Sequence, residues 1–493
     1  MKRFWKQPWL LMALLAGGLA SACTDTDGPA EEKALPTGAS TYVAFSIQHN
    51  GQLGNSPRTR VDESDYNDQG TYEGDHDEWL NTIDLYLTTP DGTFLESRRF
   101  TADDLTTAVD AAGNQFIKPR QALQTTAGDK VATIVVNSPM PLMADAPADD
   151  YRFTTNASLP MASIAGYVYE AAYDRTLLLV VATGKSEVVT IEEGVSADEV
   201  AAGKNSIDIT ISRVASKVLV TKSADMENNT QLGGTFKDIT YSVAQGALSV
   251  YLLPQDDGVT YTTWGSEYVP TGTYLATSGQ YYCYDDLHTP SKVETDLRTV
   301  ADMNANIAQY QAKLLLENVH TEGSDATTTG YRKGNTTYVL VRTTFVPDAA
   351  SIRDGGALAA DGTFYVGGTD GVIYSSIAAA TNETIGTKNQ PVYTYVGGKM
   401  LYYIWPNPDD VKHPMNSPIM RNNIYCINIT AINKLGVNWN PLNPGLDNPD
   451  PKPDGDEPES PIVPSDPLSL EDTYMSFDIA TLPWRVHSTD IEL

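Results

Sequence analysis

TYVAFSI, residues 41–47, recurs near the end of the chain as TYMSFDI, residues 473–479. Four of the seven positions are identical: the threonine, the tyrosine, the phenylalanine and the final isoleucine. In the first copy Val43, Phe45 and Ile47 alternate with other residues, which is typical of a β-strand with one buried face. We therefore expect two strands with the same pattern of buried side chains, one before residue 50 and one in the last 21 residues.

Short β-rich runs fill most of the chain between these copies, up to about residue 440. Examples are TIDLYLTT (82–89), KVATIVVN (130–137) and NIYCINITAI (423–432), and most are bounded by Gly, Pro, Asn or Asp. This spacing indicates antiparallel sandwiches. Helical periodicity is limited to residues 103–112, 196–203 and 297–316. A break at 223–234 divides the region in two, so we predict a mainly β protein with two sandwich domains in tandem and few short helices.

The composition excludes several classes of function. Acidic residues outnumber basic ones 63 to 33, giving a net charge of −30 over 493 residues, so binding to nucleic acid is not expected. The six histidines are scattered, and no HExxH, CxxC, GxSxG or P-loop motif is present. We predict no enzyme, no cofactor and no metal site. The aromatic run YYIW (402–405) could bind a sugar ring, but packing in a sandwich core is favoured.

The amino-terminal segment is typical of export. Basic residues precede an apolar run from Trp9 to Leu15, and small residues then lead to Cys23 in LASAC. The run is too short to stay in a bilayer, which favours a secretory signal. Cys23 is the predicted site of lipid attachment, with ordinary cleavage at the same place as the alternative. Cys283 and Cys426 could form a disulfide, but nothing in the sequence fixes the distance between them.

The chain changes composition abruptly after residue 440. Nine of the 27 residues from Pro441 to Pro467 are proline, which indicates an extended, semi-rigid spacer. The predicted organisation is a signal peptide at 1–22, a propeptide with a removable strand at 23–60, a first sandwich at 61–225, a second sandwich at 226–440, a Pro-rich linker at 441–470 and a carboxy-terminal donor strand segment at 471–493.

The two similar strands predict an exchange between subunits. Arg58 and Arg60 lie in a loop rich in Gly, Pro and Ser, so a protease could cut there and release the first strand. The slot that it leaves would accept the tail of a neighbouring chain by strand addition, with alternate side chains setting the register. The removable strand is assigned to Tyr42, Val43, Phe45 and Ile47. The donor strand is assigned to Tyr474, Met475, Phe477 and Ile479, with Trp484 and Val486 beyond Pro483. Because slot and tail are different surfaces, the contact repeats head-to-tail and builds a filament.

Three segments carry a resemblance to a known family: YRKGNTTYVLVRTTFVP (331–347), NSPIMRNNIYCINITAINKLGVNWNPLNP (416–444) and the tail TYMSFDIATLPWRVHSTDIEL (473–493). They resemble the type V pilus fimbrilins of Bacteroidales, in particular the major subunits of the minor (short) fimbriae of Porphyromonas. The resemblance implies two transthyretin-like β-sandwich domains and export as an outer-membrane lipoprotein. It also implies maturation by an arginine-specific protease and a carboxy-terminal donor strand.

The same resemblance implies the partners and the location. The expected partners are identical subunits, anchor and tip fimbrial subunits, and receptors on host or bacterial surfaces. The expected location is a cell-surface fimbrium that supports adhesion and biofilm formation. The alternative function is a monomeric surface lipoprotein that binds glycans through its many tyrosines and keeps the lipid on Cys23. A lipid-blocked Cys23 would favour this alternative, and a free end at Thr59 or Val61 would favour the fimbria.

Overall fold

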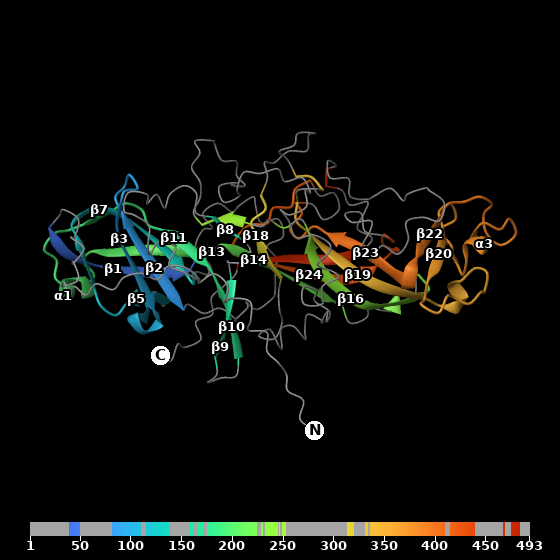
Figure 1. Cartoon of the computed structure of the whole chain (residues 1–493), viewed down its shortest axis with the longest axis horizontal. Helices are drawn as coiled ribbons and strands as arrows, with labels where there is room; N and C mark the ends of the chain where they lie inside the picture. Colours follow the sequence, from blue (N-terminus) through green and yellow to red (C-terminus); the bar gives the residue numbers. More distant parts are fainter. Residues whose placement is uncertain are drawn as a thin grey trace, which may run out of the picture.

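A computed structural model of the chain describes residues 39–49, 81–109, 115–138, 158–160, 165–170, 175–223, 228–229, 232–244, 246, 249–252, 313–319, 331–333, 336–409, 415–438, 467–468 and 475–483. The described residues form two β-rich regions toward opposite ends of an elongated molecule (Figure 1). The predicted mainly β fold is confirmed. The transthyretin-like arrangement of each region stays a prediction.

The first region consists of strands that surround one apolar core. They are β1 (Ser40–His49), β2 (Thr82–Thr88), β3 (Phe94–Thr101), β4 (Leu105–Val109), β5 (Gln115–Pro119), β6 (Leu123–Thr126), β7 (Gly128–Val136), β11 (Ala182–Lys185), β12 (Val189–Ile191) and β13 (Ser206–Arg213). Their order is β3-β2-β7-β11-β13-β1-β5-β4, with β12 paired to β7 and β6 paired to β1. Alternation along β13 shows which of its faces points into the core. Ile207, Ile209 and Ile211 are buried there, and the residues between them are more exposed.

The second region is a sandwich of two four-stranded sheets. One sheet has the order β18 (Lys313–Leu316), β14 (Ala215–Lys222), β24 (Asn423–Ile432), β25 (Met475–Pro483), and the other has the order β15 (Asn228–Asn229), β16 (Gly234–Ala244), β19 (Tyr338–Pro347), β23 (Lys399–Ile404). Side chains from both sheets share one core, for example Val220 and Ile427 from the first sheet and Val341 and Tyr402 from the second. Sheets that bury their apolar faces against each other in this way form a sandwich.

Smaller elements complete the two regions. They are the ribbons β8 (Ser158–Pro160) with β17 (Ser249–Tyr251) and β9 (Ala165–Glu170) with β10 (Arg175–Val180), the sheet of β20 (Phe364–Gly367), β21 (Ile373–Tyr374) and β22 (Val392–Tyr395), the helices α1 (Ala197–Ala201) and α3 (Ile377–Ala380), and the 3-10 turns η1 (Ala102–Asp104), η6 (Ala349–Ser351) and η7 (Val396–Gly398). Among the described residues, no helix is long and apolar enough to span a membrane, and no three side chains of metal-binding type cluster together.

The chain passes from one region to the other at Val214, which is fully buried between β13 and β14. Polar contacts hold the junction. The carbonyl of Leu252 accepts hydrogen bonds from Thr183 in the first region at 2.7 Å and from Arg421 in the second region at 3.3 Å. Arg421 also forms a buried ion pair with Glu317, with 3.1 Å between nitrogen and oxygen. The ion pair fixes Arg421 within the second region, so bending at the junction would have to break a hydrogen bond to the Leu252 carbonyl.

The sequence-based predictions of local structure were right in some places and wrong in others. The helix expected within 196–203 is present as α1, and the YYIW run is buried in the second region as favoured. The helix expected at 103–112 is wrong, because a single 3-10 turn capped by Thr101 and Asp104 leads directly into β4. The end of the 297–316 stretch is also a strand, β18. Most strand pairs are antiparallel as predicted, but β1 pairs parallel with β13 and β14 pairs parallel with β24.

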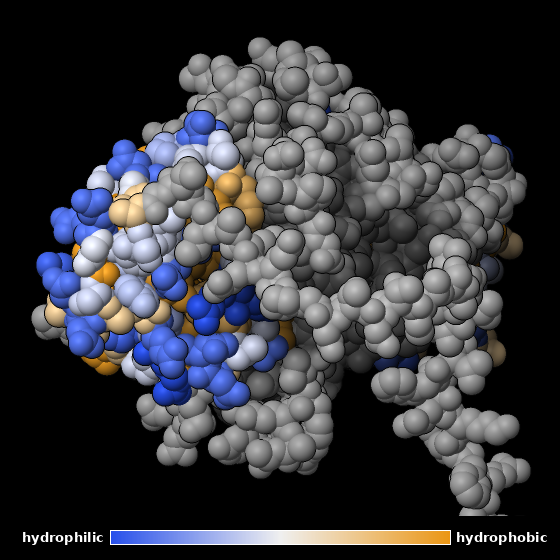
Figure 2. All heavy atoms as spheres, turned by 60° about the vertical axis from the view of Figure 1, so that its left-hand side comes forward, coloured by the Kyte–Doolittle hydropathy of each residue, from blue (hydrophilic) through white to orange (hydrophobic). Residues whose placement is uncertain are grey.

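The face of the first region that Figure 2 presents is mostly hydrophilic, with small apolar areas between the polar side chains.

Candidate assembly site around the first strand

The first strand, β1, lies inside its sheet instead of at an edge. It runs parallel to β13 from Ala44 opposite Ser206 to His49 opposite Ile211. On its other side it runs antiparallel to β6 from Ser40 to Val43 and meets β5 at Ile47. We call the place between β13 on one side and β5 and β6 on the other the β1 seat. A strand with neighbours on both sides has its backbone groups paired in both directions, so it is an integral part of the sheet.

The inward face of β1 belongs to the core of the first region. Val43 and Phe45 are 1% exposed and Ile47 is 2% exposed. The ring of Phe45 packs edge-on against Phe100, with 5.2 Å between ring centroids and 71° between ring planes. Such edge-to-face pairs add to the stabilisation from buried area. Three of the predicted removable residues are therefore core residues, and the fourth, Tyr42, is half-buried.

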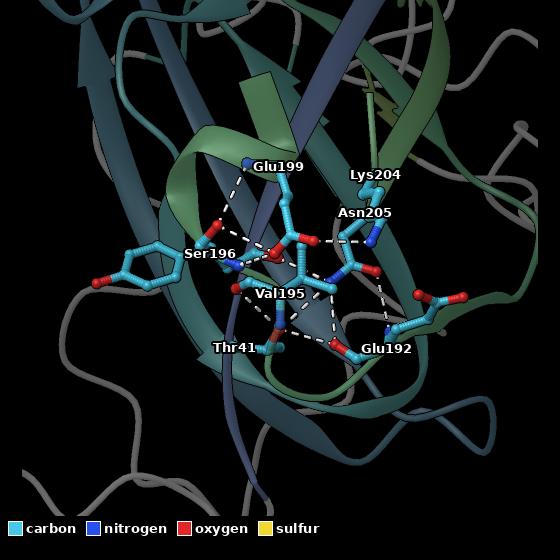
Figure 3. A network of polar contacts seen from close by, with 8 residues as sticks. Thr41, Glu192, Val195, Ser196, Glu199, Lys204 and Asn205 are labelled. Atoms are coloured by element: carbon cyan, nitrogen blue, oxygen red, sulfur yellow. Dashed lines mark hydrogen bonds and ion pairs between the residues drawn. The ribbon is translucent and has the colours of Figure 1, made fainter. Parts of the chain in front are cut away.

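A polar cluster holds the beginning of β1. The hydroxyl of Thr41, which is 1% exposed, donates to the carbonyl of Glu192 at 2.7 Å and accepts from the main-chain N–H of Val195 at 3.1 Å. It also accepts from the side-chain amide of Asn205 at 3.3 Å. We call the Glu192 carbonyl, the Val195 N–H and the Asn205 amide the Thr41 bracket (Figure 3). The bracket uses both the donor and the acceptor capacity of one hydroxyl.

The bracket extends to the backbone of the strand. The N–H of Tyr42 donates to the carbonyl of Val195 at 3.2 Å, and the N–H of Ala44 donates to the carbonyl of Asn205 at 3.1 Å. The amide of Asn205 donates to the carbonyl of Tyr42 at 2.9 Å. The loop that contains Glu192, Val195 and Asn205 thus contacts the first residues of β1 through side-chain and main-chain groups. These contacts fix the position of β1 relative to its neighbouring strands.

Local interactions shape the loop that carries the bracket. Ser196 and Glu199 form a capping box at the start of α1, and Lys204 pairs with Glu199 at 2.8 Å (Figure 3). The hydrogen bonds from Lys204 and then Ser196 lower the pKa of Glu199 to about 2, so its carboxylate stays charged at neutral pH. Asn205 has a φ of 48°, in the left-handed region that asparagine adopts more readily than most residues. Its side chain also accepts the N–H of Glu192 at 2.9 Å, which closes the loop.

One outward-facing pair on β1 involves a charge. Ser46 lies opposite Asp208 on β13, and its hydroxyl donates to the Asp208 carboxylate at 2.5 Å. Asp208 is exposed and Ser46 is 8% exposed. A neutral donor therefore faces a carboxylate at this position of the seat.

The tail strand, β25, lies on the second region of its own chain. It pairs antiparallel with β24 from Pro483 opposite Asn423 to Met475 opposite Ile432, with a bulge near Ala431. It forms the outermost strand of that sheet, at the end of the order in which β24 precedes it. In a single chain, the partner edge that a β-prone tail requires is thus supplied by β24.

The end of the Pro-rich linker is also in contact with the second region. Pro467 forms a β-bridge with Arg332. Leu468 is 3% exposed and packs in a cluster with Tyr338, Tyr403 and Trp405, whose Tyr338 and Trp405 rings lie 5.4 Å apart. We call this group the aromatic cluster. It fixes the chain at Leu468, a few residues before β25 begins.

The predicted site residues fall in three groups. Val43, Phe45 and Ile47 are brought together in the β1 seat, and Tyr42 lies half-buried in the same strand. Met475, Phe477 and Ile479 lie in β25, on the second region. The remaining predicted residues lie outside the described residues, as does Cys283: Cys23, Arg58, Arg60, Tyr474, Trp484 and Val486. The roles of these residues stay predictions.

Sequence reasoning missed the bracket residues Glu192, Val195 and Asn205. The only local signal was the Ser196–Glu199 capping box, which predicts a helix start but gives no information about contact with residue 41. Cys426 is buried in β24.

Comparison with known proteins supports the resemblance found in the sequence. Residues 393–490 match the model of a family described as major fimbrial subunit protein type IV, fimbrillin, C-terminal. The chain is 29% identical over 524 residues to the minor fimbrium subunit Mfa1 of Porphyromonas gingivalis, and the match covers 98% of this chain and 99% of the relative. The resemblance to fimbrilins is confirmed. These relatives are fimbrial subunits and not enzymes, in agreement with the prediction.

Solved structures that match this chain include fimbrial proteins of Porphyromonas gingivalis. A fimbrilin (FimA) from Porphyromonas gingivalis W83 matches with a TM-score of 0.45 and 14% identity, over 91% of this chain and 98% of that one. The tip fimbrial protein Mfa3 of Porphyromonas gingivalis matches with a TM-score of 0.33 and 9% identity, over 79% of this chain and 95% of that one.

Proposed function

Because the chain resembles the fimbrilins over nearly its whole length, we propose that it is a structural subunit of a cell-surface fimbria, matured by proteolysis and polymerised head-to-tail by strand exchange. The observation that carries the proposal is the position of β1. β1 lies in the middle of its sheet. Residues 50–81 separate it from β2 along the chain, and they include Arg58 and Arg60.

Loss of β1 would leave the first region incomplete. Burying Val43, Phe45 and Ile47 stabilises the fold by roughly 1.5 to 3 kcal/mol each. Backbone hydrogen bonds to β13, β5 and β6 add about 0.5 to 1.5 kcal/mol apiece. The total is comparable to the whole stability of a typical domain, about 5 to 15 kcal/mol. A first region without β1 therefore needs a replacement strand in order to stay folded.

The tail has the pattern that the β1 seat selects. The residues at 473–479 repeat threonine, tyrosine and apolar residues two apart, as at 41–47. To reach a neighbour, the tail must leave β24, so the exchange replaces pairing within one chain by pairing between chains. The new pairing also buries three apolar side chains in a closed core, which favours the polymer.

The remaining steps follow the expectations from the sequence. The precursor is exported and carries a lipid on Cys23 in the outer membrane. An arginine-specific protease cuts after Arg58 or Arg60, and the fragment with β1 leaves. Identical subunits then form the shaft, anchor and tip fimbrial subunits bind its ends, and the fimbria contacts host or bacterial receptors in adhesion and biofilm formation.

Two measurements test the proposal. Amino-terminal sequencing of sheared surface fibres should find a free end at Thr59 or Val61, and no fragment containing β1 should remain in the fibre. Chains truncated before Glu471 should be exported and cleaved but should not polymerise. Fibres of normal length made from truncated chains, or fibres that keep residues 41–47 covalently attached, would contradict strand exchange.

The alternative, a monomeric glycan-binding lipoprotein, loses one of its supports. The aromatic run that could have formed a sugar platform is buried, with Tyr402, Tyr403 and Trp405 each 2% exposed or less. A sugar ring could not stack on these side chains without unfolding the sandwich.

A further inference from the structure

We propose that the Thr41 bracket sets the register of strand exchange by binding the hydroxyl of Thr473 in the incoming tail. The inference rests on the proposed function, which states that the tail fills the β1 seat. It adds that the Thr41 bracket determines which residue of the tail pairs with which residue of the seat. The bracket is a specificity element because it accepts a hydroxyl in one position only.

The apolar pockets alone leave the register ambiguous. Alternation fixes which face of the tail is buried, but a shift by two residues keeps the same face inward. Shifting the tail by two would place Phe477 and Ile479 in the pockets of Val43 and Phe45, and Thr481 in that of Ile47. Two of three pockets would still hold large apolar side chains, so burial discriminates weakly between these registers.

The bracket removes this ambiguity. It presents the Glu192 carbonyl as an acceptor and the N–H groups of Val195 and Asn205 as donors. The Asn205 amide also donates to the Glu192 carbonyl at 3.0 Å, so the Val195 N–H is the group that depends most on the hydroxyl. A threonine or serine hydroxyl can donate and accept here, whereas an apolar side chain would leave the Val195 N–H without its acceptor. Thr41 is 1% exposed, so water cannot easily replace the missing partner. Leaving a buried N–H such as that of Val195 without an acceptor costs about 1 to 3 kcal/mol.

Only one residue of the tail meets all the requirements of the seat. The seat needs a hydroxyl residue followed by apolar residues two, four and six positions later. Of the tail's serines and threonines, Thr473 alone has this pattern, with Met475, Phe477 and Ile479. The others fail because polar, proline or terminal positions follow them: Ser476, Thr481, Ser488 and Thr489. The bracket and the pockets therefore agree on a single register, with Thr473 in the place of Thr41.

The register can be read by disulfide crosslinking between two chains that each carry one added cysteine. Ser206 faces Ala44 across β1 and β13, so in the proposed register it faces Ser476. Adjacent strands lie about 4.8 Å apart, within the range that a disulfide can bridge. Chains with Ser206→Cys are mixed with chains carrying Ser476→Cys for the proposed register, or Tyr474→Cys or Asp478→Cys for a shift by two.

These crosslinks are compared in fibres of the otherwise unchanged chain and in fibres with Thr473→Val, Thr473→Ser or, as matched control, Thr481→Val. None of these changes touches the β1 seat of the precursor. With Thr473 present, the Ser476→Cys crosslink should predominate. Thr473→Val should spread crosslinking to the shifted pairs and make joints dissociate roughly tenfold to a hundredfold faster. Thr473→Ser and Thr481→Val should preserve the original pattern.

An unchanged crosslink pattern and dissociation rate in Thr473→Val fibres would overturn the inference while leaving strand exchange intact. If none of the three tail cysteines crosslinks to Ser206→Cys in fibres, strand exchange into this seat is itself wrong, and the inference fails with it.

Discussion

Phe45→Ala and Phe477→Ala should weaken different states of the same protein. Phe45 is 1% exposed and its ring packs against Phe100 at 5.2 Å. Truncating a core phenylalanine to alanine costs about 3 to 5 kcal/mol, of which the ring pair accounts for about 0.5 to 1.5 kcal/mol. In the precursor this cost falls on Phe45. In the proposed polymer the same pocket would hold Phe477, and Phe45 would have been removed.

We therefore expect one variant to weaken only the precursor and the other to weaken only the fibre. Phe45→Ala should lower the free energy of unfolding of the precursor's first region by about 3 to 5 kcal/mol, measured by denaturant titration. Once cleaved, it should form fibres that dissociate at the normal rate. Phe477→Ala should leave the first region of the precursor unchanged. Its fibres should dissociate roughly 100- to 4000-fold faster, since each 1.4 kcal/mol is a factor of ten.

Fibre dissociation can be followed by the disappearance of ladders on gels after graded heating in detergent. Phe100→Ala, which removes the shared ring partner in the wall of the seat, should weaken both precursor and fibre and serves as a positive control. Normal dissociation of Phe477→Ala fibres, or fast dissociation of Phe45→Ala fibres, would show that the tail does not occupy the pocket of the first strand.

Asp84→Asn should remove a pH-dependent part of the first region's stability. Burial raises the pKa of Asp84 to about 6 despite the nearby Arg99, so Asp84 binds a proton more tightly in the folded state than in the unfolded state. The stabilisation is complete below the unfolded value of 3.8 and is lost as pH rises through about 6, with a difference of about 2 to 3 kcal/mol. Denaturant titrations at pH 4 and pH 7 should show this difference for the unchanged chain relative to the variant, and equal pH dependence of both would contradict it. Asp478→Ser should slow fibre dissociation about twofold to fivefold at pH 7, because in the proposed register Asp478 would lie opposite Asp208, where the precursor has Ser46. A variant whose fibres dissociate at the normal rate would argue against this register. Leu468→Ala should destabilise the second region by about 2 kcal/mol and leave the first region unchanged, because it creates a cavity in the aromatic cluster. Measuring the unfolding transition of each region separately tests this prediction. An unchanged transition of the second region would refute it.

Much of the fold could be predicted because burial of one face leaves a clear periodic pattern. The alternation of Val43, Phe45 and Ile47 predicted both the strand and its inward face, and the structure buries all three. The stretch at 103–112 was misleading because its acidic start resembles the first turn of a helix. The β-branched residues Thr106, Thr107 and Val109 and the pairing of β4 with β5 determine the result.

Contacts between distant segments could not be predicted from one sequence. The parallel pairing of β1 with β13 joins residues more than 150 positions apart, and no local pattern specifies it. The same holds for Asn205, whose role depends on the position of Thr41 in space. The place of β25 on β24 was also not predicted, because an edge strand is compatible with any exposed sheet edge.

The contact of Leu468 with the aromatic cluster limits how far a subunit can reach. The backbone from Leu468 to Met475 spans at most about 25 Å when fully stretched. If Leu468 stays bound in the fibre, the long Pro-rich segment before it adds nothing to this distance. Neighbouring subunits are then connected by a short segment, which gives a high effective concentration of the tail at the joint and limits the movement of one subunit relative to the next. A shaft assembled in this way should resist bending, as a surface appendage under fluid drag requires.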